Sequence, residues 1–148
     1  MKKILKVALL CLILISLTAC GVKRELSEKE LEKVLNDEKF VVNNLIDSME
    51  DKNIKSVYAA NNGVYQIQCY VFKTEKTAKD AFKGNVKTFE SESKIKGSKK
   101  IKDNYELYTQ KLSDTYNSVT RVGKNIIYAS IKIEYKSDFN KILKKLTK

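Results

Sequence analysis

The sequence predicts an α+β fold: a single domain in which one meandering antiparallel sheet has helices packed on one face, in the order helix–strands–helix–strands–helix. Two observations lead to this fold class. Three stretches repeat apolar residues at helical spacing, and the stretches between them are short runs rich in β-branched and aromatic residues. Strands joined by tight turns pair in antiparallel orientation, so we expect these runs to form one sheet within residues 27–148.

The first predicted helix begins at residues 27–30, which have the sequence of a capping box. Ser27 can accept from an early backbone N–H, and Glu30 can reach back to the N–H of Ser27. The helix is expected to end near Asn36, and residues 40–42 are interpreted as a short strand after that break.

A β-hairpin is predicted at residues 61–63, because Asn-Gly between two strand-like runs is the strongest short-range hairpin signal. In the second arm, residues 65–71, apolar or aromatic residues alternate with Gln66 and Gln68. We therefore expect Cys69 on a buried face and the two glutamines on a partly wet face.

At Thr74 the period of the apolar residues changes from two to about 3.6, which predicts a helix capped by Thr74 or Thr77. This helix should end at residues 91–93. The lysine-rich segment 94–102 is expected to be a solvated loop that bends at Gly97.

A second β region follows, with strands expected over residues 105–108 and 116–122. A turn at residues 123–125 leads into a further strand. The last helix, capped by Ser137 or Asp138, carries apolar residues at helical spacing and needs a surface to bury them against.

The N-terminal residues have the organisation of a secretory signal. Lys2, Lys3 and Lys6 precede an apolar run from Val7 to Ala19, which has 13 residues. A membrane-crossing helix needs about 20 apolar residues. We therefore expect this segment to be removed rather than to span the membrane.

Residues 17–20, with the sequence Leu-Thr-Ala-Cys, resemble the lipobox of bacterial lipoproteins. The resemblance implies that diacylglycerol is attached to the Cys20 thiol and that residues 1–19 are cleaved off as a signal peptide. Diacylglycerol supplies the two acyl chains that stable anchoring requires. Residues 20–26 would then be the lipidated cysteine and a short tether. The expected location is the extracytoplasmic face of the cell membrane.

The formal charge of the chain is +11, and removal of the three signal-peptide lysines leaves +8. A basic domain held at a membrane is attracted to anionic lipid or to anionic wall polymer, so both are candidate partners besides the bilayer. The alternative is that the lysines reflect the composition of an AT-rich genome. Nucleic acid is not expected as a partner, because no nucleic-acid-binding motif is visible.

The chain contains no histidine, so it lacks the commonest general base and the commonest transition-metal ligand. Cys11 leaves with the signal peptide and Cys20 carries lipid, which leaves Cys69 without a disulfide partner. Residues 47–51 hold a small acidic cluster whose spacing differs from that of a calcium-binding EF-hand loop. We therefore expect no catalytic residues, no metal site and no cofactor.

The candidate binding residues are Tyr105, Tyr108, Tyr116, Arg121 and Tyr128. They belong to one predicted β region, where the tyrosines could form an aromatic platform for a glycan or a peptide. Arg121 offers a planar fork for an anion. The alternative is that tyrosine is simply a favoured strand residue.

A set of features in the mature chain carries a family resemblance: Ala78 with Phe82, Asn104 and Tyr105 with Tyr108, Tyr116, residues 121–125, Tyr128 and the closing amphipathic helix. In these features the chain resembles a group of small, functionally uncharacterised lipoproteins of low-GC Gram-positive bacteria. The group brings no activity with it, so the resemblance implies no catalytic residue.

We expect a membrane-anchored extracytoplasmic lipoprotein that acts as a non-catalytic binding or interaction module for a partner not identified by the sequence. One alternative is a small solute-binding lipoprotein associated with a transporter, although the chain is short for two lobes around a pocket. Another is a wall-acting enzyme that uses carboxylates, which would need two acids in a shared cleft.

Replacement of Cys20 by serine tests the anchor. Without the thiol there is no site for diacylglycerol, and the lipoprotein signal peptidase recognises the lipid-modified cysteine. Cys20→Ser should therefore abolish both lipidation and cleavage. Mass spectrometry and detergent partition should show wild-type protein that has lost about 2 kDa of signal peptide and gained a lipid. Normal processing of the serine variant would contradict the assignment.

Overall fold

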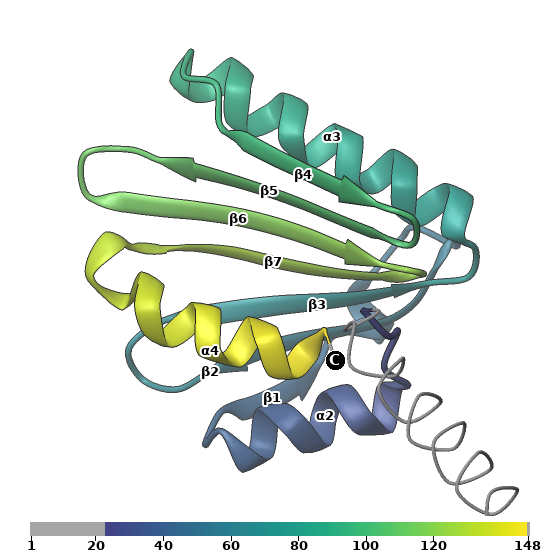
Figure 1. Ribbon diagram of the computed structural model, residues 1–148. Coiled ribbons are helices and arrows are strands. Elements are labelled where there is room, and N and C mark those ends of the chain that lie inside the picture. The colour runs from purple at the N-terminus through teal and green to yellow at the C-terminus, as the bar shows by residue number, and fades with distance from the viewer. Residues whose placement is uncertain (1–22, 148) are drawn as a thin grey trace, which may run out of the picture.

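The computed structural model describes residues 23–147, and it confirms the α+β fold class with a single antiparallel sheet (Figure 1). The elements are α2 (Glu28–Asp37), β1 (Val41–Asn44), 3₁₀ helix η2 (Ile46–Ser48), β2 (Ile54–Asn61), β3 (Gln66–Phe72), α3 (Glu75–Ser93), β4 (Ser98–Lys102), β5 (Tyr105–Lys111), β6 (Thr115–Val122), β7 (Asn125–Lys132), 3₁₀ helix η3 (Ile133–Tyr135) and α4 (Lys136–Leu146). The predicted order of helices and strands is confirmed.

The sheet consists of two antiparallel meanders. Its strand order is β1-β2-β3-β7-β6-β5-β4, so the first meander ends at β3 and the last strand of the second meander, β7, lies next to it. The two strands pair with Cys69 opposite Ile127 and Tyr70 opposite Ile126. This pairing joins the two meanders into one seven-stranded sheet with β1 and β4 at its edges.

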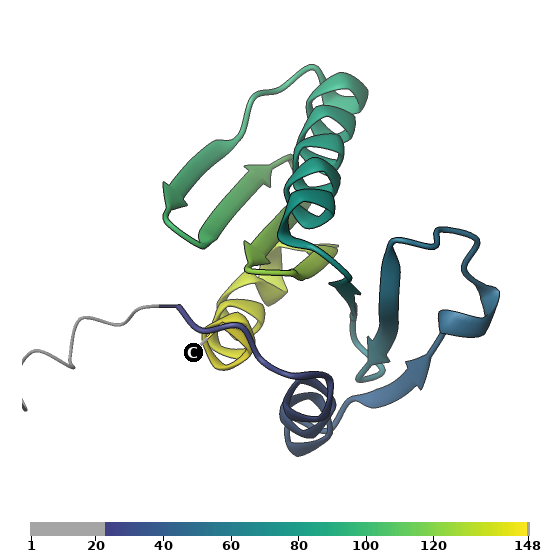
Figure 2. The same ribbon diagram turned by 90° about the vertical axis from the view of Figure 1, so that its right-hand side faces the viewer.

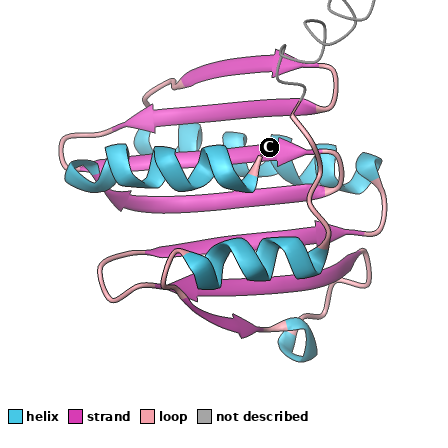
Figure 3. Ribbon diagram, turned by 60° about the horizontal axis from the view of Figure 1, so that its bottom comes forward, coloured by secondary structure: helices cyan, strands magenta, loops and turns pink. Residues whose placement is uncertain are grey.

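The helices cover both faces of the sheet, which corrects the expectation that all of them pack on one face. The core that includes Leu31 of α2 and Phe139 of α4 lies on one face, and the core that includes Phe82 of α3 lies on the other. In Figure 3, α4 passes in front of the strands and α3 behind them. The reason lies in the central strand β7. Its neighbouring residues Ile126 and Ile127 are both buried but point to opposite faces, so each face of the sheet must be covered.

Local capping agrees with the sequence at two of the three helices. Ser27 and Glu30 form the predicted capping box, and Thr74 caps α3 by accepting from the N–H of Thr77. The expected cap of the last helix is wrong, because α4 continues directly from η3 and its N-cap residue, Tyr135, makes no side-chain cap hydrogen bond.

Residues 98–102 form the edge strand β4 and not the expected solvated loop. Every residue of β4 is exposed, so no alternation of buried and exposed side chains marked it in the sequence. Its backbone pairs with β5, and its lysines protect the edge of the sheet from pairing with another chain.

Residues 23–26 are packed on the domain, whereas the sequence assigned them to the tether. Leu26 is buried in the core under α2 and α4. Its carbonyl accepts from Asn125 Nδ2 at 2.7 Å, and Glu25 Oε2 accepts from the N–H of Lys124 at 2.7 Å. Gly123 allows this approach, since a Cβ at that position would lie 1.9 Å from Glu25 Oε2.

An ion pair is buried on the face of the sheet that carries α3. Arg121 is fully buried; its Nε donates to Glu106 Oε2 at 2.5 Å, and its Nη1 donates to the carbonyl of Gly123 at 2.8 Å. The two residues face each other across β5 and β6. Removal of one partner leaves a buried charge without compensation, which costs about 3–5 kcal/mol.

Glu106→Ala should therefore lower the free energy of unfolding by about 3 kcal/mol, as measured by urea denaturation. The matched control is Asp37→Ala, which removes the exposed ion pair with Lys33 and should change it by less than about 1 kcal/mol. Equal effects of the two substitutions would contradict the structural role of the buried pair.

Candidate binding groove

A groove lies between α3 and strands β2, β3 and β7. It has a volume of about 440 Å³ and is lined by eight residues: Ile54, Gln68, Tyr70, Phe72, Ala81, Asn85, Ile126 and Tyr128. Cross-strand register places Gln68 opposite Tyr128 and Tyr70 opposite Ile126. The groove is thus built from both meanders, and α3 forms one wall.

The lining divides into an apolar floor and a polar rim. Ile54, Phe72 and Ile126 are buried and form the floor. Gln68, Tyr70, Asn85 and Tyr128 are partly exposed, so their polar atoms can be reached from solvent. A concave apolar surface with a few directed polar groups is the usual composition of a ligand site.

Hydrogen bonds within the groove hold the rim side chains in place. The hydroxyl of Tyr70 donates to Gln68 Oε1 at 2.7 Å, and Asn85 Nδ2 donates to the carbonyl of Ala81 at 2.9 Å. Each bond uses one atom of a carboxamide. The other atom of each carboxamide, Gln68 Nε2 and Asn85 Oδ1, makes no hydrogen bond within residues 23–147. A donor and an acceptor therefore remain for a ligand.

Aromatic stacking fixes the two tyrosine rings. Tyr128 stacks on Phe89 of α3, with ring centroids 5.4 Å apart and an interplanar angle of 19°. Tyr70 stacks on Phe72 at 6.5 Å. Both rings are therefore presented to the groove in defined positions.

The groove carries no ionised side chain among its eight lining residues. Burial raises the pKa of Tyr70, with a smaller effect from Tyr128, and burial likewise raises the pKa of Tyr128. Both phenols therefore stay neutral at physiological pH. A charged ligand would lose hydration here without gaining a charged partner, so the lining favours an uncharged one.

The structure brings one of the five predicted binding residues, Tyr128, into this groove. Tyr108 and Arg121 lie on the same face of the sheet but are buried in or beside the core under α3, while Tyr105 and Tyr116 are buried on the opposite face. The five do not form a surface platform, because β-strand alternation sends Tyr105 and Tyr108 to different faces.

Sequence reasoning missed Gln68, Tyr70 and Asn85. The signal for Gln68 was present, since it alternates with buried Cys69 and Ile67 and was expected on a partly wet face. That Gln68 and Asn85 line the same groove depends on where α3 packs on the sheet, and the period of apolar residues does not reveal that position.

The other sequence candidates do not form a site in the described part of the chain. Cys69 is fully buried, and burial raises the pKa of its thiol to about 12, so its nucleophilic thiolate is scarce. Within residues 23–147, no group of three or more Cys, Asp or Glu side chains is arranged to hold a metal ion. Cys20 lies outside the described residues.

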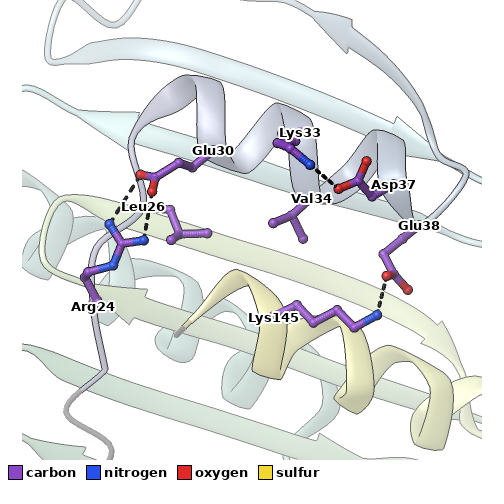
Figure 4. Close-up of a pocket in the computed structure, with 8 residues that line it drawn as sticks. All are labelled: Arg24, Leu26, Glu30, Lys33, Val34, Asp37, Glu38 and Lys145. Atoms are coloured by element: carbon purple, nitrogen blue, oxygen red, sulfur yellow. Dashed lines mark hydrogen bonds and ion pairs between the residues drawn. The ribbon is translucent and has the colours of Figure 1, made fainter. Parts of the chain in front are cut away.

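A second cleft, of about 360 Å³, lies between α2 and α4 (Figure 4). Its charged residues are paired: Arg24 with Glu30 at 2.8 Å, Lys33 with Asp37 at 2.7 Å, and Lys145 with Glu38. The hydrogen bond from Arg24 is the largest cause that lowers the pKa of Glu30 to about 2. Since these charges already have partners, we assign this cleft to the packing of the two helices.

Comparison of the chain with protein-family models, with curated proteins and with solved structures gives no match. None of the helices in residues 23–147 combines the length and the apolar composition needed to cross a membrane.

Proposed function

We propose that this protein is a lipid-anchored extracytoplasmic binding module that takes an uncharged ligand in the groove between α3 and the sheet. The observation that carries the proposal is the lining: stacked tyrosines and two carboxamides around an apolar floor, without an ionised group among the eight residues. The signal segment and Cys20 support the anchor.

The chemistry of the rim favours an oligosaccharide as the ligand. A sugar ring has an apolar C–H face, which fits an aromatic ring, and hydroxyl groups that both donate and accept. Gln68 Nε2 can donate and Asn85 Oδ1 can accept. An uncharged glycan satisfies both atoms without the desolvation cost of a charge.

The test is a calorimetric titration with the uncharged probe tetra-N-acetylchitotetraose. Asn85→Ala removes the carboxamide of α3, and alanine is the best helix former, so the fold should be kept while affinity falls about tenfold for a lost hydrogen bond of about 1.4 kcal/mol.

Thr88→Ala is the matched control. Thr88 lies on α3, is exposed, and donates to the carbonyl four residues before it, as Asn85 does, but it does not line the groove. Its substitution should leave the affinity unchanged. Absence of binding by the wild type, or equal loss in both variants, would overturn the proposal.

A further inference from the structure

Three lysines converge where the described chain begins. The Nζ of Lys23 donates to Thr147 Oγ1 at 3.1 Å, just beyond the end of α4, and lies 5.8 Å from the centroid of the Tyr105 ring on β5. Lys144 is in the last turn of α4. Lys100 of β4 is paired with Leu107, which packs against the core under α4, so Lys100 points to that same face.

Lys100 and Lys144 are each close enough to Lys23 to repel its amine. After burial, Lys100 and Lys144 are the next largest causes that lower the pKa of Lys23. Lys100 and Lys144 are exposed, and within residues 23–147 none of the three has a carboxylate within ion-pair distance. Like charges gathered without a counter-charge favour an external anion.

The cluster lies close to the attachment point. Because residues 23–26 are held on the domain, only residues 21 and 22 separate Lys23 from Cys20, a reach of about 10 Å at full extension. The Debye length at physiological ionic strength is about 8 Å. The lysines would thus remain within or near the range where an anionic surface attracts them.

We propose that Lys23, Lys100 and Lys144 form a docking surface for anionic lipid headgroups. This surface would orient the domain with the face that carries α4 toward the bilayer. The inference rests on the lipid anchor of the proposed function. The chain enters the domain beside α4 and away from α3 (Figure 2). The groove, which lies on the α3 face, would therefore open away from the membrane.

The experiment uses the chain from Gly21 onward without lipid, since residues 23–147 contain the whole sheet and both cores. Its binding to vesicles of phosphatidylglycerol and phosphatidylcholine in equal amounts is measured by co-sedimentation, with pure phosphatidylcholine vesicles as reference. Each lysine near the surface contributes about fivefold. The combined substitutions Lys23→Gln, Lys100→Gln and Lys144→Gln should thus weaken binding about a hundredfold.

The matched control replaces Lys79, Lys83 and Lys87 by glutamine. These lysines are exposed on α3, so the control has the same net charge as the first variant and should lose much less binding. Equal losses would mean that total charge, not this surface, attracts the protein, and would overturn the inference.

Two further outcomes would also overturn it: no preference of the wild type for anionic vesicles, or binding to soluble poly(glycerol phosphate) without binding to vesicles. Because the chain used lacks lipid, neither result depends on the anchor. Titration of the Lys23, Lys100 and Lys144 variant with tetra-N-acetylchitotetraose measures ligand binding in the groove separately. It should give the wild-type affinity.

Discussion

The pairing of β3 with β7 is the constraint on which the rest of the structure depends. It joins two meanders that are far apart in the chain, with Gln68 opposite Tyr128 and Cys69 opposite Ile127. Since successive side chains of a strand point to opposite faces, a shift of one residue would exchange the faces of β3. Gln68 would then enter the core under α4 and Cys69 would enter the groove. One register therefore fixes both cores and the composition of the groove.

The same sheet separates two surfaces of different chemistry. On the α3 face, the stacked rings of Tyr70 and Tyr128 lie beside carboxamides in an uncharged groove. On the α4 face, Lys23 lies with other cations where the chain enters the domain. A charge placed in the groove would lack a partner, whereas the exposed amines of Lys100 and Lys144 stay in water and act over a Debye length. The proposed ligand groove and the proposed membrane-facing lysines therefore lie on opposite faces of the sheet.

Much of the fold was predictable from local signals, because capping boxes, Asn-Gly turns and apolar periods act over a few residues. Ser27 and Thr74 cap their helices as expected. The two-sided placement of the helices was not predictable in this way, since it depends on Ile126 and Ile127 both being covered after the meanders meet. The groove was predicted only at Tyr128, because long-range packing of α3 on the sheet brings Gln68 and Asn85 into the same lining. Strand β4 lacked any burial pattern, and its pairing with β5 became evident only in three dimensions.

Two-dimensional NMR during addition of tetra-N-acetylchitotetraose can show whether both meanders and α3 jointly form a ligand site. The side-chain amide signals of Gln68 and Asn85 and the ring signals of Tyr128 report on β3, α3 and β7 respectively. All three signals are expected to shift together with one dissociation constant, while the side-chain amide signal of exposed Asn43 on β1 stays in place. Shifts confined to one of these elements, or centred on the cleft between α2 and α4, would contradict a ligand site formed jointly by both meanders and α3.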